Sequence, residues 1–211
     1  MGDEIKQTCS IGTLCHSNQI LKNNNLKTCS YPFDWIFSNC DNVIHCLEDN
    51  FKIFLDKSYY VTISNKKCGH SYYSHNMWWH HNPLLNLDDY HYYIRCIIRF
   101  KKLLLCEERK LFVMTFVNRE IFNEEEKNNI IKFNNKFSKF TKNYTLLVIF
   151  HIKNKESHQS IFTHQDNIDF LELHTLSDSN GLQFNNNNDE DYLNNIINKT
   201  YNFNIEIKPD I

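Results

Sequence analysis

Two uninterrupted apolar runs constrain the fold of this chain more than any other feature. One extends from Lys110 to Phe116 and the other from Thr145 to Phe150. Between them, Asn123 can cap a helix that has three glutamates in its first turn, where acids favour the helix dipole. A strand without polar alternation is typical of a sheet that is buried on both faces. The two runs therefore predict a central parallel or mixed sheet with helices on both faces, which is an α/β fold.

Weaker patterns supply the other elements. We expect strands over 4–11, 59–64 and 168–173, and helices over 14–23, over 87–105, from Asp41, and from Asp189 or Asp191. The first expected helix has Thr13 as its cap. Tyr59–Tyr73 reads as a hairpin, and His75 to Pro83 as a loop rich in aromatic residues and histidine. Without an internal repeat or a domain boundary, the sequence predicts a single domain over residues 1–211.

Composition excludes several classes of protein. Hydrophobic residues make up 41% of the 211, and 16 Phe, 11 Tyr and 3 Trp supply bulky side chains, so a packed core is expected. The formal net charge is −2 with no long basic tract, which argues against a dedicated nucleic-acid-binding protein. No apolar run reaches the roughly 18–20 residues that span a bilayer, so no membrane partner is expected either.

The cysteines indicate a reducing compartment. Eight Cys are scattered through predicted core segments, and residues 1–6 are polar, unlike the start of a signal peptide. A chain of this length does not need disulfide bonds for stability. The abundance of Asn, Lys, Ile, Phe and Tyr is typical of an AT-rich genome, such as that of a large DNA virus or a protozoan. We therefore expect a cytoplasmic protein, in the host cytoplasm if the source is viral.

Cys15 is the first candidate for chemistry. It follows the segment Ser10-Ile11-Gly12, which predicts a strand and a turn, and it stands where a helix should begin. Free backbone N–H groups at a helix start lower a thiol pKa from about 8.5 to roughly 3.5–7.5. Ligands also bind at the carboxyl ends of strands in open α/β sheets. On position alone, a small buried hydrophobic residue is the more common use of such a cysteine.

A reactive thiol needs a base, and several histidines compete for that role. His80 and His81 lie in the aromatic loop, whereas His151 and His174 follow apolar strands and should lie at strand carboxyl ends. His16 points the wrong way around the helix to pair with Cys15. Asp34 can orient an imidazole, or can simply cap a turn. A further alternative is a hydrolytic or transferase site that uses Ser10 with His151 or His174.

Metal and nucleotide sites lack their usual signatures. The sequence has no C-x-x-C, no H-E-x-x-H and no Gly-rich phosphate loop, so neither a metal nor a cofactor is expected. Arg95 and Arg99 share a helix face at a spacing of four and can bind an anion or a carboxylate. A solvated face or a salt bridge to Asp34 or Asp88 is the plainer interpretation.

Several segments together resemble one family. They are Ser10-Ile11-Gly12-x-x-Cys15, Tyr31-Pro32-Phe33-Asp34-Trp35-Ile36, an aromatic-x-His loop, and Arg95-x-x-x-Arg99-Phe100 before Leu111-Phe112-Val113. From about Ser10 to Leu173 the chain resembles the DUF1796 family, described as papain-like cysteine peptidases. The resemblance implies Cys15 as nucleophile, His80 as base and Asp34 as orienting acid. It also implies substrate contacts from Trp35, Trp79, Arg95 and Arg99. An acid tends to follow the family's histidine, whereas His81 follows here, so the choice of base stays open.

The function that the resemblance implies is thiol-dependent acyl chemistry. The thiolate would attack a carbonyl in peptide or isopeptide hydrolysis or in acyl transfer, with a protein or peptide as substrate. Backbone N–H groups at the start of the Cys15 helix would hold the oxyanion. The resemblance also offers a papain-like α+β architecture as an alternative fold. A non-catalytic binding module that retains the fold is the alternative function.

Overall fold

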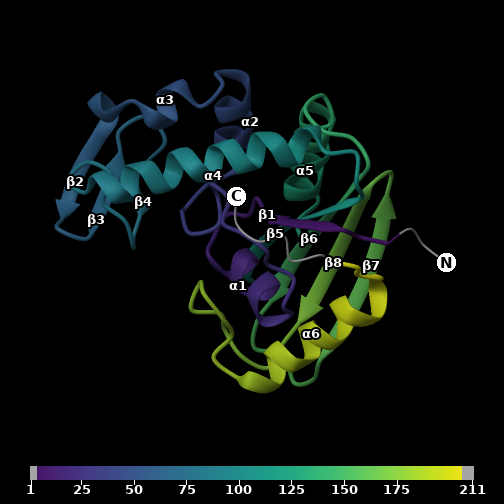
Figure 1. Ribbon diagram of the computed structural model, residues 1–211. Helices are drawn as coiled ribbons and strands as arrows, with labels where there is room; N and C mark the ends of the chain where they lie inside the picture. Colours follow the sequence, from purple (N-terminus) through teal and green to yellow (C-terminus); the bar gives the residue numbers. More distant parts are fainter. Residues whose placement is uncertain (1–3, 206–211) are drawn as a thin grey trace.

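The computed structural model describes residues 4–205, and a five-stranded sheet forms its centre (Figure 1). The strand order is β1-β5-β6-β8-β7, in which the first four strands are parallel and β7 is antiparallel at one edge. The bounds are β1 Gln7–Ser10, β5 Lys110–Arg119, β6 Tyr144–Ile152, β7 Gln159–Gln165 and β8 Ile168–His174. The mixed sheet confirms the predicted α/β fold class.

The two apolar runs are the central strands of this sheet. Every residue of β6 is buried, and so are the first six residues of β5. Val113 faces Leu147 across the ladder and Met114 faces Val148. Alternate residues of these strands enter two separate hydrophobic clusters, one on each side of the sheet. Burial on both faces explains why neither strand has polar alternation.

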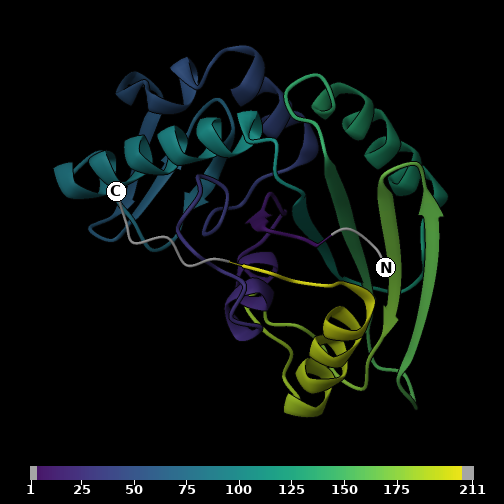
Figure 2. The ribbon, with the colours of Figure 1, turned by 45° about the vertical axis from the view of Figure 1, so that its right-hand side comes forward.

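Helices cover both faces of the sheet, as the apolar runs predict. On one face, α1 (His16–Asn23) and α6 (Asn187–Thr200) pack Ile20 and Leu193 against the strands. On the other face lie α2 (Cys40–Glu48), α4 (Leu87–Leu105) and α5 (Glu124–Phe137). Figure 2 shows α1 and α6 together on one side and α5 on the opposite side.

A second, antiparallel sheet lies under one end of α4 (Figure 1). It consists of β2 (Tyr60–Ser64), β3 (Lys67–His70) and β4 (Ser74–Trp78), preceded by the short helices α3 (Lys52–Leu55) and η1 (Lys57–Tyr59). The predicted hairpin is confirmed, but the expected loop 75–83 contains most of β4, because Met77 and Trp78 are buried. The larger hydrophobic cluster includes both Trp78 and Val148, so the two sheets share one core.

Asparagine side chains fix several helix starts that the sequence leaves open. Asn39, and not Asp41, caps α2 by accepting a 2.8 Å hydrogen bond from the Asn42 amide. Asn186, and not an aspartate, caps α6, whereas Asn123 caps α5 as predicted. The first helix begins at His16 with Cys15 as its N-cap, later than expected. Within residues 4–205 no helix is long and apolar enough to cross a membrane.

The connections after β1 and β5 leave the sheet in opposite directions. From β1 the chain passes to α1 on one face, and from the neighbouring β5 it passes to α5 on the other. The carboxyl ends of two adjacent strands with diverging connections form a crevice, the usual ligand site of open α/β sheets. Cys15 ends the turn that leads from β1 to α1, and this turn starts at the crevice.

Candidate functional site

Hydrogen bonds tie the turn before Cys15 to the end of β5. The Thr13 hydroxyl donates to the Thr115 carbonyl at 2.5 Å, and the Ser17 and Thr115 hydroxyls are 2.7 Å apart. Gly12 permits this close approach, since a Cβ at position 12 would lie 1.8 Å from the Ser17 hydroxyl oxygen. Cys15 is half-buried at the start of α1. The thiol is thus held on a rigid turn at the crevice.

The surroundings of Cys15 oppose ionisation of the thiol. Burial raises its pKa, the hydrogen bond from its own backbone amide lowers it, and the nearby Asp34 carboxylate raises it. The net direction is upward, so the expectation of a lowered pKa at this helix start is wrong. Desolvation of the sulfur outweighs the favourable backbone. Such a thiol needs a base before it can act as a nucleophile.

Asp34 is completely buried and pairs with a lysine. Its carboxylate accepts hydrogen bonds from the Lys27 ammonium and, at 2.9 Å, from the Tyr31 amide. Lys27 also donates to the Asn18 side-chain oxygen at 2.7 Å. Burial raises the pKa of Asp34 to about 6, against the lowering effect of Lys27. In this arrangement the carboxylate holds a cation in place of the expected imidazole.

The Asp34 environment predicts a specific pH dependence of stability. Because burial raises its folded pKa from 3.8 to about 6, ionising the carboxyl weakens the fold as pH rises through this window. The free energy of unfolding of the wild type is compared with that of Asp34→Asn at each pH. We expect the difference, wild type minus variant, to fall by roughly 3 kcal/mol as the pH rises from 4 to 7. Urea denaturation at several pH values measures it. Buried His151, whose pKa is lowered to about 4, gives the opposite slope but is common to both proteins. A flat or rising difference would contradict the expectation.

His81 and Asp89 form an oriented pair at the edge of the second sheet. The His81 Nδ1 and the Asp89 Oδ1 are 2.9 Å apart, and the Asp89 Oδ2 accepts from the Asn82 amide at 2.7 Å. The imidazole stacks on Tyr92, with ring centroids 4.8 Å apart, and meets Tyr93 edge-on at 5.6 Å. Asp89 lies in the first turn of α4, so a helix and two rings fix the imidazole.

Tyr93 packs beside this pair. Its ring is buried, and its hydroxyl has no hydrogen-bond partner among residues 4–205. Burial raises the pKa of Tyr93, and Asp89 and Cys15 are among the nearby groups that raise it further. Tyr93 is therefore in ring contact with His81 and lies near enough to Cys15 for the two groups to interact electrostatically.

The other predicted contact residues are spread around this region. His80 is exposed and has no hydrogen bond or ion pair to any described residue. Trp79 is 40% exposed; the Lys67 ammonium lies 3.4 Å from its ring centre. Trp35 lines a shallow pocket next to Lys27. On α4, Arg95 is exposed and Arg99 half-buried. The substrate-binding roles of Trp35, Trp79, Arg95 and Arg99 stay predictions.

The strand-end histidines have structural partners. His151 is buried, and its Nε2 lies 2.6 Å from the Thr175 hydroxyl. The His174 Nε2 lies 2.6 Å from Glu172. The Ser10 hydroxyl is buried and bonds to no described residue, so it does not pair with either histidine. The His16 ring bonds to the Ser179 hydroxyl at 2.9 Å and faces Glu190, away from the thiol, as expected.

The sequence analysis does not identify two residues that pair with site residues. Lys27 belongs to a polar stretch with no periodicity, and only the fold brings it to Asp34. Asp89 is visible as an acid in the first turn of a predicted helix, eight residues after His81. That spacing was the available signal for the pair. Among residues 4–205, no three His, Cys, Asp or Glu side chains are grouped to hold a metal ion.

Comparison with known proteins gives one match. No curated protein and no solved structure matches the chain. One family model matches residues 6–92, and the family is described as "Putative papain-like cysteine peptidase (DUF1796)". The matched segment contains Cys15, Asp34, His80, His81 and Asp89. The resemblance is confirmed over this stretch, where residues 6–92 match the model of the DUF1796 family.

Proposed function

We propose that the protein is a papain-like cysteine hydrolase, a peptidase or a related acyl-transfer enzyme. In this proposal Cys15 is the nucleophile, His81 the base and Asp89 the acid that orients it. The observation that carries it is the 2.9 Å contact between His81 and Asp89 beside Tyr93, a residue near enough to Cys15 for the two to interact electrostatically. A base held through Nδ1 presents Nε2 to a nucleophile, which is the arrangement of catalytic triads.

His81 is the better-supported base of the two adjacent histidines. Its ring is half-buried, stacked and hydrogen-bonded, whereas His80 is exposed and unsupported by any described residue. A base contributes most when its orientation is fixed before reaction. We therefore propose His81 in the role that family resemblance gave to His80. Asp34 acts in this proposal as the buried partner of Lys27.

The reaction follows from these roles. His81 Nε2 takes the thiol proton as the Cys15 sulfur bonds to the substrate carbonyl carbon. The carbonyl oxygen becomes an oxyanion, which the Cys15 backbone N–H can stabilise; the His16 N–H is already donated to Gly181 at 3.0 Å. The imidazolium gives its proton to the leaving amine as the C–N bond breaks. Water, activated by His81, then attacks the acyl-enzyme and releases the acid and the thiol.

Substrate and compartment are further parts of the proposal. A protein or peptide substrate is supported by the family description of residues 6–92. A reducing cytoplasm, the host cytoplasm for a viral protein, stays a prediction from cysteine usage and composition. A non-catalytic binding module is the competing function, and the raised pKa of the Cys15 thiol favours it.

Covalent trapping separates the two functions. The wild-type protein is incubated at pH 7 with a peptidyl epoxysuccinate, and the modified cysteine is located by mass spectrometry. We expect an adduct on Cys15, because only a thiol with a nearby base should open the epoxide at this pH. Cys15→Ala should remain unmodified. A folded wild-type protein without an adduct on Cys15, or with equal labelling of Cys29 and Cys40, would favour the binding module.

A further inference from the structure

A pocket of about 670 Å³ lies between α2 and α5, at the carboxyl ends of β1 and β5. Thr13, which follows β1, and Phe116, in the C-terminal half of β5, both line it. It thus occupies the crevice where the chain leaves neighbouring strands in opposite directions. Its volume falls within the range of small-molecule and side-chain binding sites.

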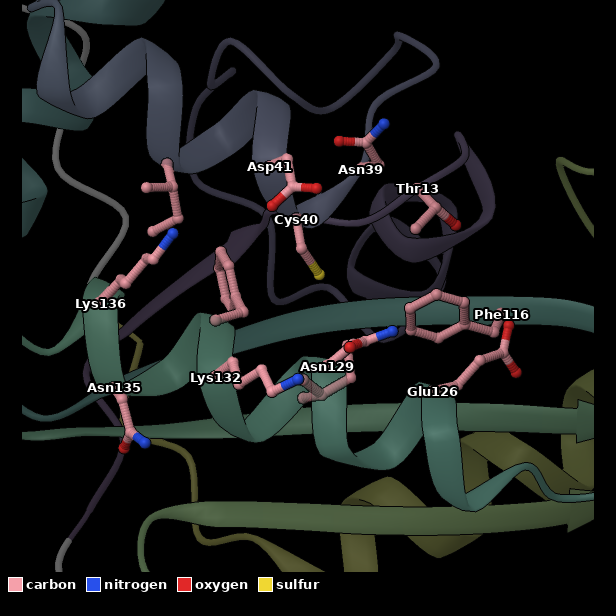
Figure 3. Close-up of a pocket in the computed structure, with 13 residues that line it drawn as sticks. Thr13, Asn39, Cys40, Asp41, Phe116, Glu126, Asn129, Lys132, Asn135 and Lys136 are labelled. Atoms are coloured by element: carbon pink, nitrogen blue, oxygen red, sulfur yellow. The ribbon is translucent and has the colours of Figure 1, made fainter.

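The inner wall of the pocket is apolar and chemically inert. Four hydrophobic side chains contribute to it: Ile44, Phe116, Ile130 and Phe133. Figure 3 shows the Cys40 thiol directed from α2 toward α5. Burial raises the pKa of Cys40 to about 12, so this thiol is not a rival nucleophile at neutral pH. The wall suits a bulky apolar group.

The rim of the pocket carries an excess of positive charge. Lys132 and Lys136 extend from successive turns of α5 (Figure 3), and neither forms an ion pair with a residue in the described range 4–205. Glu126 is already paired with Arg119 at 2.5 Å. Asp41 on α2 is the remaining acid of the lining. Two lysines against one unpaired acid favour an anionic ligand.

A continuous segment connects this pocket with the proposed catalytic residues. The Ser38 hydroxyl donates to the Gly12 carbonyl at 2.9 Å, and the Ser38 amide donates to the Thr13 carbonyl at 3.3 Å. The next residue, Asn39, lines the pocket. The preceding residue, Phe37, meets the Trp79 ring edge-on at 5.9 Å, two positions before His81. The segment 37–39 thus joins the pocket to the turn before Cys15 and to the Trp79 ring, which precedes His81 by two positions.

We propose that this pocket is a substrate subsite beside Cys15 that takes a bulky apolar side chain flanked by acidic residues. The proposal rests on the peptidase function and names its preferred substrate class. The apolar wall would desolvate the side chain, at roughly 25 cal/mol per Å² buried. Lys132 and Lys136 would attract the neighbouring carboxylates. A fatty acid also combines an apolar group with a carboxylate. The test therefore compares a fatty acid with acidic peptides as the ligand.

Binding to the Cys15→Ala variant tests the subsite without chemistry. Isothermal titration at low salt compares the peptides Ac-Ala-Phe-Glu-Glu-amide and Ac-Ala-Phe-Lys-Lys-amide, with dodecanoate as a third ligand. We expect the acidic peptide to bind at least about tenfold more tightly than the basic one, and Lys132→Glu/Lys136→Glu to remove that preference. Lys139→Glu/Lys199→Glu, a matched charge change at exposed positions outside the lining, should leave it intact.

The other outcomes separate failure of the subsite from failure of the enzyme. Equal binding of the two peptides, or a preference that survives Lys132→Glu/Lys136→Glu, excludes an acidic subsite at this rim. Binding of dodecanoate without the acidic peptide shows a fatty-acid site. Failure of the enzyme itself is distinguishable: the acidic peptide then binds, but wild type gives no adduct on Cys15. An adduct without peptide preference leaves the peptidase and removes the subsite.

Discussion

Replacing Val148 with aspartate is expected to unfold the protein. Val148 lies in the middle of β6 with no exposed surface, hydrogen-bonded on one side to β5 and on the other to β8. Its side chain belongs to the larger hydrophobic cluster, among apolar neighbours. An unpaired buried charge costs several kcal/mol, which is comparable with the total stability of about 5–15 kcal/mol. Circular dichroism with urea titration should show no cooperative transition for the variant.

Ile161→Asp is the matched control for this substitution. Ile161 lies on β7, the antiparallel edge strand, and is 41% exposed. The same chemical change should there alter the free energy of unfolding by less than about 1 kcal/mol. A Val148→Asp variant that unfolds with the wild-type midpoint would show that β6 is not the central strand of a two-sided core.

Replacing His81 with alanine is expected to abolish most of the turnover. Burial raises the pKa of the Cys15 thiol, so the thiol depends on a base to remove its proton. If His81 is that base, loss of the imidazole should lower kcat/KM for a peptide substrate by about 10²–10⁴-fold. His80→Ala, a substitution at the adjacent exposed histidine, should change kcat/KM by no more than a few fold. A fluorogenic peptide library, screened first with wild type, supplies the substrate.

Asp89→Asn refines the same test. The amide keeps the size of the side chain but removes the charge that orients and stabilises the imidazole, so we expect an intermediate loss of kcat/KM. Equal losses in His80→Ala and His81→Ala, or a loss confined to His80→Ala, would return the role of base to His80. Thermal melting of each variant checks that the fold is intact.

The sequence predicts the parts of the fold in which apolar pattern decides structure. The central strands of the sheet contain the two apolar runs, Lys110 to Phe116 and Thr145 to Phe150. A strand without polar alternation would expose apolar side chains to water unless both faces of the sheet were covered. The sequence does not predict β7, because this edge strand has partly or fully exposed residues and little apolar pattern. The sequence predicts a loop in place of β4, because the apolar residues of this strand, Met77 and Trp78, come only at its end.

The candidate site was predictable only in part. The Gly12 turn and the position of Cys15 followed from local pattern. The raised pKa of the thiol did not, because it depends on how deeply tertiary packing buries the sulfur and on the approach of Asp34. The Lys27 partner of Asp34 and the stacking of His81 on Tyr92 depend equally on packing between distant segments.

The pH profile of Cys15 alkylation tests the central claim most directly. Iodoacetamide labelling is followed by mass spectrometry from pH 5 to 10 in wild type, His80→Ala and His81→Ala, with half-buried Cys29 as an internal reference. If His81 is the base, His81→Ala should move the Cys15 profile to more alkaline pH by more than one unit, since the thiol must then ionise unaided. His80→Ala should retain the wild-type profile. A Cys15 profile that is the same in His81→Ala and wild type would contradict the pairing of Cys15 with His81.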